Sequence, residues 1–136
     1  MRTSKNLIKK LSSIAEEYQV KAIFRKASPW YAGYYHGDKK TITVVVRDSI
    51  STTVTTFFHE LSHVLEHRDG YYSNYYKRGQ TLTVRRRLAL RAERHTDKRG
   101  KKLCKKHFPK VVFKLNYQTK EQVKFLKEWY SDGRLQ

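Results

Sequence analysis

Two histidines and a glutamate are spaced in a way that suits metal-dependent hydrolysis. His59, Glu60 and His63 form the pattern His-Glu-Xaa-Xaa-His. On a helix, His59 and His63 lie one turn apart, so both imidazoles project from one face and can bind a single zinc ion. The carboxylate of Glu60 can then accept a proton from a metal-bound water, as a general base does. The motif therefore predicts Zn²⁺ as the cofactor and hydrolysis as the chemistry.

The residues around this motif favour a helix with one buried face. Possible N-caps precede it at Asp48, Ser49 and Ser51, and a stop follows at Asp69 and Gly70. Apolar residues recur at helical spacing, namely Val54, Phe57, Phe58, Leu61, Val64 and Leu65. The alternative interpretation is a solvated helix face that happens to carry two histidines. The caps and the apolar stripe favour the metal site.

The chain is strongly basic, with 30 Lys and Arg against 12 Asp and Glu and a formal net charge of +18. Such a surface attracts nucleic acid, acidic proteins or anionic membranes. The length of 136 residues suits one domain, which we expect to span 1–136. The single cysteine, Cys104, excludes an intramolecular disulfide and fits a reducing compartment. Because no apolar segment resembles a signal peptide or a membrane span, we expect a cytoplasmic protein without membrane insertion.

The remaining pattern predicts a small α+β domain, in which a short twisted sheet packs on the motif helix and on a second, basic helix. Besides the motif helix, helices are expected at 4–18, 81–107 and 119–129. Strands are expected at 20–25 and at 41–46, where every residue is β-branched. Residues 30–38 are interpreted as a loop or an irregular hairpin, and 111–113 as a short strand or a hydrophobic return.

A catalytic zinc site needs a third protein ligand, and three sources compete for that place. His67 or Asp69 follows the motif directly, and His95 lies on the basic helix. The basic helix also carries Glu93 and Asp97, which are one turn apart and are the only acids in a run of Lys and Arg. The alternative interpretation is that these two acids only form ordinary ion pairs with neighbouring Lys and Arg on the helix surface. We favour Glu93 as the ligand, with Asp97 accepting a hydrogen bond from a ligand histidine.

The motif and the acid pair together resemble the gluzincin metallopeptidases, and most closely the small ImmA/IrrE group. The resemblance covers about 41–109 and includes Pro109; the chain departs from the group's usual pattern at Thr96 and Arg99. It implies a zincin-like domain and a zinc-dependent protease, often a regulatory one of bacteria, phages or mobile elements, with a protein or peptide as substrate. It also implies roles for five residues: His59, His63 and Glu93 as zinc ligands, Glu60 as the general base, and Asp97 as the hydrogen-bond acceptor that orients a ligand histidine.

Two further groups of residues are candidates for contacts with substrates or partners. Tyrosines after the motif helix can donate to an oxyanion or contact a substrate, or can simply cap the core: Tyr71, Tyr72 and Tyr75. Arginines early in the basic helix are candidate contacts to DNA or RNA: Arg85, Arg86, Arg87, Arg91 and Arg94. The alternative function is therefore a basic nucleic-acid-binding protein with a structural or vestigial zinc site.

Overall fold

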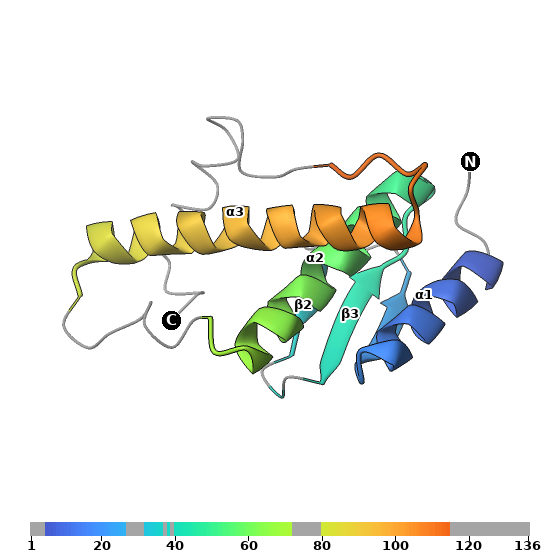
Figure 1. The fold of residues 1–136 in the computed structure, drawn as a ribbon, viewed down its shortest axis with the longest axis horizontal. Helices are drawn as coiled ribbons and strands as arrows, with labels where there is room; N and C mark the ends of the chain where they lie inside the picture. Colours follow the sequence, from blue (N-terminus) through green and yellow to red (C-terminus); the bar gives the residue numbers. More distant parts are fainter. Residues whose placement is uncertain (1–4, 27–31, 37, 39, 72–79, 115–136) are drawn as a thin grey trace.

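The computed structural model describes residues 5–26, 32–36, 38, 40–71 and 80–114, and shows a small α+β domain. The elements in chain order are α1 (Lys5–Glu17), β1 (Lys21–Arg25), β2 (Gly33–Tyr35), β3 (Thr41–Val45), α2 (Ile50–Arg68) and α3 (Leu82–His107) (Figure 1). The helix expected at 119–129 lies outside the described residues. Among the described helices, none is both long enough and apolar enough to cross a membrane.

The sheet is mixed, with β3 at its centre and the strand order β1-β3-β2. Strand β1 runs parallel to β3, and β2 runs antiparallel to it. The residues of β3 from Ile42 to Val45 are all buried, as expected for a central strand made of β-branched side chains. The strands expected at 20–25 and 41–46 are confirmed. Within 30–38, the hairpin interpretation is the correct one, because β2 pairs with β3.

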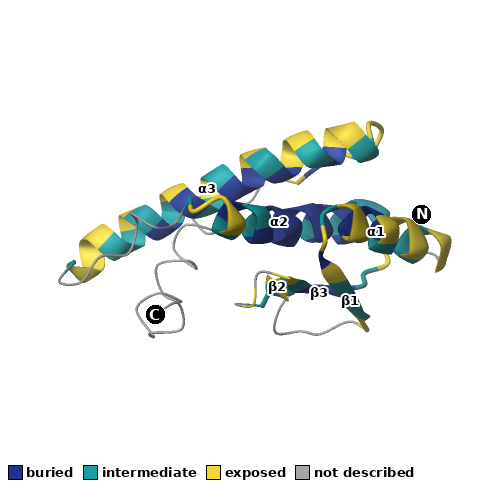
Figure 2. Cartoon of the chain, turned by 60° about the horizontal axis from the view of Figure 1, so that its bottom comes forward, coloured by how far each residue is buried: buried dark blue, intermediate teal, exposed yellow. Residues whose placement is uncertain are grey.

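Helix α2 is the middle layer of the molecule, between the sheet on one side and α3 on the other (Figure 2). Its Ser49 N-cap accepts a hydrogen bond from the backbone N–H of Thr52 at 3.3 Å. The core joins apolar side chains from α1, β3 and α2: Leu11, Ile14, Ile42, Val44, Val54, Phe57, Phe58, Leu61 and Val64. Since both sides of α2 are covered, polar residues such as Ser62 and Glu66 are buried as well. The expected motif helix is confirmed.

Helix α3 packs on α2 through small residues. Ala89, Ala92 and Gly100 are all buried on the inner face of α3. A Cβ atom at Gly100 would lie 3.3 Å from the carbonyl oxygen of Phe58 and 2.9 Å from the ring of Phe113. Glycine therefore permits a close approach of the two helices, one residue before the first histidine of the motif.

After α3 the chain returns across the start of α2 without forming a strand at 111–113. The Ser51 hydroxyl donates to the carbonyl of Val112 at 3.0 Å, and the Lys114 N–H donates to Thr55 Oγ1 at 3.1 Å. Phe113 joins the core between these two contacts. Of the two interpretations of this segment, the hydrophobic return is therefore correct.

Gly33 is the point at which β2 lies close to α2. A Cβ atom there would lie 2.7 Å from Thr56 Cγ2 and 2.8 Å from the carbonyl oxygen of Thr43. We expect Gly33→Ala to lower the free energy of unfolding by about 1–3 kcal/mol, because the added methyl group has no space. Chemical denaturation measures this loss.

The same substitution in a Thr56→Ala background separates the two contacts. The loss should persist there, because the backbone oxygen of Thr43 cannot move away as a side chain can. Complete recovery of stability in that background would contradict the backbone clash.

Candidate metal centre

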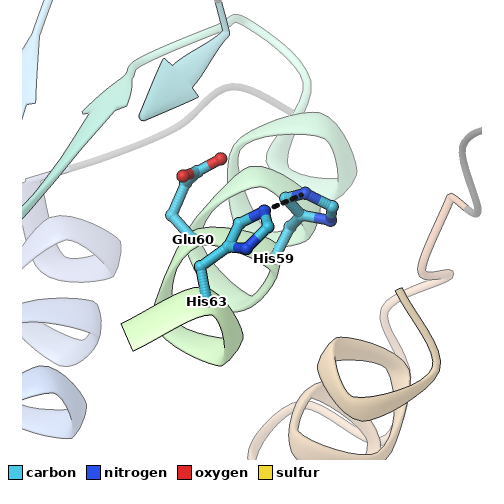
Figure 3. Close-up of side chains that lie close together, drawn as sticks. All are labelled: His59, Glu60 and His63. Carbon is cyan, nitrogen blue, oxygen red and sulfur yellow. Dashed lines mark hydrogen bonds between the residues drawn. The ribbon is translucent and has the colours of Figure 1, made fainter. Parts of the chain in front are cut away.

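The side chains of His59, Glu60 and His63 lie close together on α2 (Figure 3). One ring nitrogen from each histidine and one carboxylate oxygen of Glu60 all lie within 4.8 Å of one another. The Nε2 atoms of the two histidines are 3.1 Å apart. His59 and Glu60 are each only 8% exposed. The group is buried and its ligand atoms are close enough together to hold a metal ion.

Helix α3 brings a third candidate ligand, Glu93, to the same point. Glu93 Oε2 lies 3.0 Å from His59 Nε2, and Glu93 Oε1 lies 3.3 Å from His63 Nε2. A tetrahedral ion with bonds of about 2.0–2.1 Å to nitrogen and oxygen separates its ligand atoms by about 3.3–3.4 Å. The spacing of the three side chains is therefore close to the spacing of ligands around one zinc ion.

Asp97 lies behind His59, one turn of α3 after Glu93. Its Oδ1 atom is 2.8 Å from His59 Nδ1, and its side chain is fully buried. A carboxylate at this nitrogen favours the tautomer that carries the proton on Nδ1. The lone pair of His59 Nε2 then points toward the shared site, as metal binding requires.

In the form that binds a metal, neither Nε2 atom carries a proton, so the centre of the site then contains acceptors only. Glu93 Oε2 is buried, and within the described residues it then has no hydrogen-bond donor, with His59 Nε2 3.0 Å away. Two lone pairs at this distance repel each other unless a positive charge lies between them. A divalent cation bound by His59, His63 and Glu93 would satisfy all three groups, so the donor set fits a metal ion.

The charges in the cluster shift one another's pKa values. Burial alone would lower the pKa of His59, but the carboxylates of Asp97 and Glu93 outweigh it and hold that pKa well above the ordinary value. Burial likewise would raise the pKa of Glu93, yet the two imidazoles hold it below its usual range. The carboxylate of Glu93 is therefore ionised, as a metal ligand must be.

Glu60 differs from Glu93 in its surroundings. Burial raises its pKa above the ordinary value, and the nearby imidazoles of His63 and His59 only partly oppose this shift. On the sheet side, a Cβ atom at Gly33 would lie 3.4 Å from Glu60 Cγ, so β2 covers this side chain. A partly desolvated carboxylate with a raised pKa suits a general base.

The other candidate ligands each have a different partner. His67 Nε2 lies 2.8 Å from the hydroxyl of Tyr35, and Asp69 pairs with Arg99 at 2.8 Å. His95 Nδ1 contacts the fully buried carboxylate of Glu66. Of the candidates considered from the sequence, the structure brings Glu93 next to both Nε2 atoms.

Tyr35, on β2, is a neighbour of the site that the sequence did not single out. Its ring stacks on that of His63, with centroids 5.8 Å apart, and its hydroxyl contacts His67. Of the tyrosines that were singled out, Tyr71 stacks on His95 with centroids 3.9 Å apart, whereas Tyr72 and Tyr75 lie outside the described residues. No local pattern could have identified Tyr35, because its position depends on the pairing of β2 with β3.

Comparison of the chain with protein-family models, with curated proteins and with solved structures finds no match. What supports the resemblance to gluzincins is therefore the buried group of His59, Glu60 and His63 on α2 and the carboxylates that α3 places beside it. Any functional conclusion depends on the chemistry of these side chains.

If Glu93 is a ligand, Glu93→Gln should remove most of the stabilisation that zinc gives to the protein. Zinc at a hundredfold excess over its Kd should stabilise the wild type by about 2.7 kcal/mol, seen as a rise in the thermal midpoint. Asp69→Asn is the matched control, because it also converts a carboxylate to an amide, at a side chain that is 61% exposed. A zinc effect that survives Glu93→Gln and disappears in Asp69→Asn would overturn the assignment.

Asp97→Asn tests the hydrogen bond behind His59. The substitution keeps the shape of the side chain but removes its charge, so we expect zinc affinity to fall by about 10–100-fold. Competition with a chromophoric chelator measures this change. Lys98→Gln, at the exposed neighbouring position, should leave the affinity unchanged. An Asp97→Asn protein with wild-type affinity would show that the carboxylate is not needed for binding.

Proposed function

We propose that the protein is a zinc-dependent metallopeptidase that hydrolyses a peptide bond in a protein substrate. The observation that carries the proposal is the convergence of two imidazole Nε2 atoms and the Glu93 carboxylate, at mutual distances of 3.0–3.3 Å, beside the buried Glu60. Two histidines and one glutamate are a ligand set of catalytic zinc sites, which keep a further position for water or substrate.

The roles of the side chains follow from their positions. Zinc in this site would polarise the scissile carbonyl and lower the pKa of a water molecule toward neutrality. Glu60 accepts the proton of that water and later returns it to the nitrogen of the leaving amine. Asp97 keeps the proton of His59 on Nδ1 throughout, so that Nε2 stays available to the metal.

The position of the sheet supports a peptide as the substrate. Strand β2 is at one edge of the described sheet and lies against α2 near Glu60. An extended peptide that paired with this edge would lie along the motif helix, with its carbonyl groups beside the site. The resemblance to the ImmA/IrrE group adds that such a protease would have a regulatory role, with a protein as its substrate.

Glu60→Gln should lower the rate of peptide hydrolysis by about 100-fold or more, because the amide cannot accept the proton from water. The assay is incubation of the zinc-loaded protein with a mixed library of synthetic peptides, followed by mass spectrometry of the new termini. Zinc content should remain near that of the wild type, since Glu60 is not proposed as a ligand.

Two outcomes would contradict the proposal. Cleavage by Glu60→Gln at the wild-type rate would exclude Glu60 as the base. A zinc-loaded wild type that cleaves neither library peptides nor an unfolded protein, while Glu93→Gln still loses zinc, would leave a metal centre without peptidase activity.

A further inference from the structure

The side of α3 that faces away from α2 carries a straight row of cations. Six exposed residues recur at alternating spacings of four and three, and we call them the outer stripe: Arg87, Arg91, Arg94, Lys98, Lys101 and Lys105. At about 100° per residue, all six point within about 40° of a common direction. From the first to the last, the outer stripe is about 27 Å long.

The outer stripe is free of acidic side chains. Helix α3 contains two acids, Glu93 and Asp97, and both turn toward α2, where they join the metal centre. In Figure 2, exposed residues of α3, coloured yellow, lie on the side of the helix that faces away from α2. One helix therefore separates its charges, with carboxylates on the inner side and cations on the outer side. Combined with the net charge of +18, this gives a strongly positive ridge.

We propose that the outer stripe binds the phosphate backbone of double-stranded DNA. Duplex DNA carries about one negative charge per 1.7 Å of its axis, so a 27 Å row of cations meets many phosphates. An α-helix with its side chains, about 10–12 Å across, matches the width of the B-DNA major groove, which is about 12 Å. The deep and narrow major groove of duplex RNA does not admit side chains in this way.

The composition of α3 argues against other anionic partners. Binding of single strands relies on aromatic side chains on which bases stack, and α3 contains no Phe, Tyr or Trp. Membrane-surface helices insert a row of apolar residues beside their cations, whereas the large apolar residues of α3 that are exposed, Leu82 and Val84, both precede the outer stripe. Protein interfaces usually need buried aromatic or aliphatic anchors, which the stripe also lacks. Long cations alone suit contacts to phosphates, which carry no sequence information.

This inference goes beyond the proposed hydrolase, because the two sets of residues do not overlap. Substitutions in the outer stripe leave His59, His63, Glu93 and Asp97 intact, so helix content measured by circular dichroism reports on folding while DNA binding reports on the stripe. The two proposals can therefore fail independently.

The test is fluorescence polarisation with a labelled 20-base-pair duplex from 50 to 300 mM KCl, using the whole chain. The stripe variant is Arg91→Gln/Lys98→Gln/Lys105→Gln. The control variant is Lys21→Gln/Arg25→Gln/Lys26→Gln, at exposed positions in and directly after β1, a strand that packs on β3 and α1. Both variants lose three positive charges, and glutamine preserves helix propensity on α3.

We expect the wild type to bind with an affinity that falls steeply with salt, because each neutralised phosphate contributes about −0.9 to the slope of log K against log salt. In the stripe variant that slope should become shallower by about 2–3, and affinity at 100 mM KCl should fall at least tenfold. The control variant should retain the slope to within about 1 and the affinity to within about threefold. Lys98→Gln alone should reduce the slope by about 1.

Several results would overturn the proposal. Equal losses in the stripe and control variants would show attraction by net charge alone. An unchanged slope in the stripe variant, with the helix content of the wild type, would place the binding surface elsewhere. Tighter binding to single-stranded DNA of equal phosphate number, or stripe-dependent binding to phosphatidylserine vesicles but not to duplex, would assign the stripe to a different partner.

Discussion

The buried pairing of imidazoles with carboxylates between α2 and α3 is the constraint on which the rest of the structure depends. His59 contacts Asp97 at 2.8 Å and Glu93 at 3.0 Å, and all three groups are removed from most of the solvent. Burying charged groups costs free energy unless they are paired and hydrogen-bonded, so neither helix can bury this surface alone. The two helices must therefore pack at one register, and that register fixes the geometry of the metal centre.

A second set of contacts holds the same helices together near the end of α2. The fully buried Glu66 accepts a hydrogen bond from Thr96 at 2.6 Å, and the exposed Asp69 pairs with Arg99 at 2.8 Å. Thr96 and Arg99 are the two positions at which the chain departs from the pattern of the ImmA/IrrE group. Both departures thus make contacts between helices. They help to fix α3 beside the motif.

Local patterns in the sequence were sufficient for α1, α2, α3 and the central strand. Glu93 and Asp97 stood out because two acids at helical spacing in a basic run need an inward partner. Tyr35 could not be found, since its place beside His63 depends on a three-residue strand that forms only by pairing with β3. The contact of Glu66 with His95 was missed for the same reason, because it joins residues far apart in the chain through tertiary packing.

The close approach at Gly100 has a mechanical consequence. If α3 turns about this contact, Glu93 lies seven residues away along the axis, on a lever arm of about 10 Å. A tilt of only about five degrees would then move its carboxylate by about 1 Å, a displacement comparable to those that disable catalytic sites. The angle between α3 and α2 therefore sets the distance from the Glu93 carboxylate to the two imidazoles. An ion bound by all three groups would hold that angle fixed.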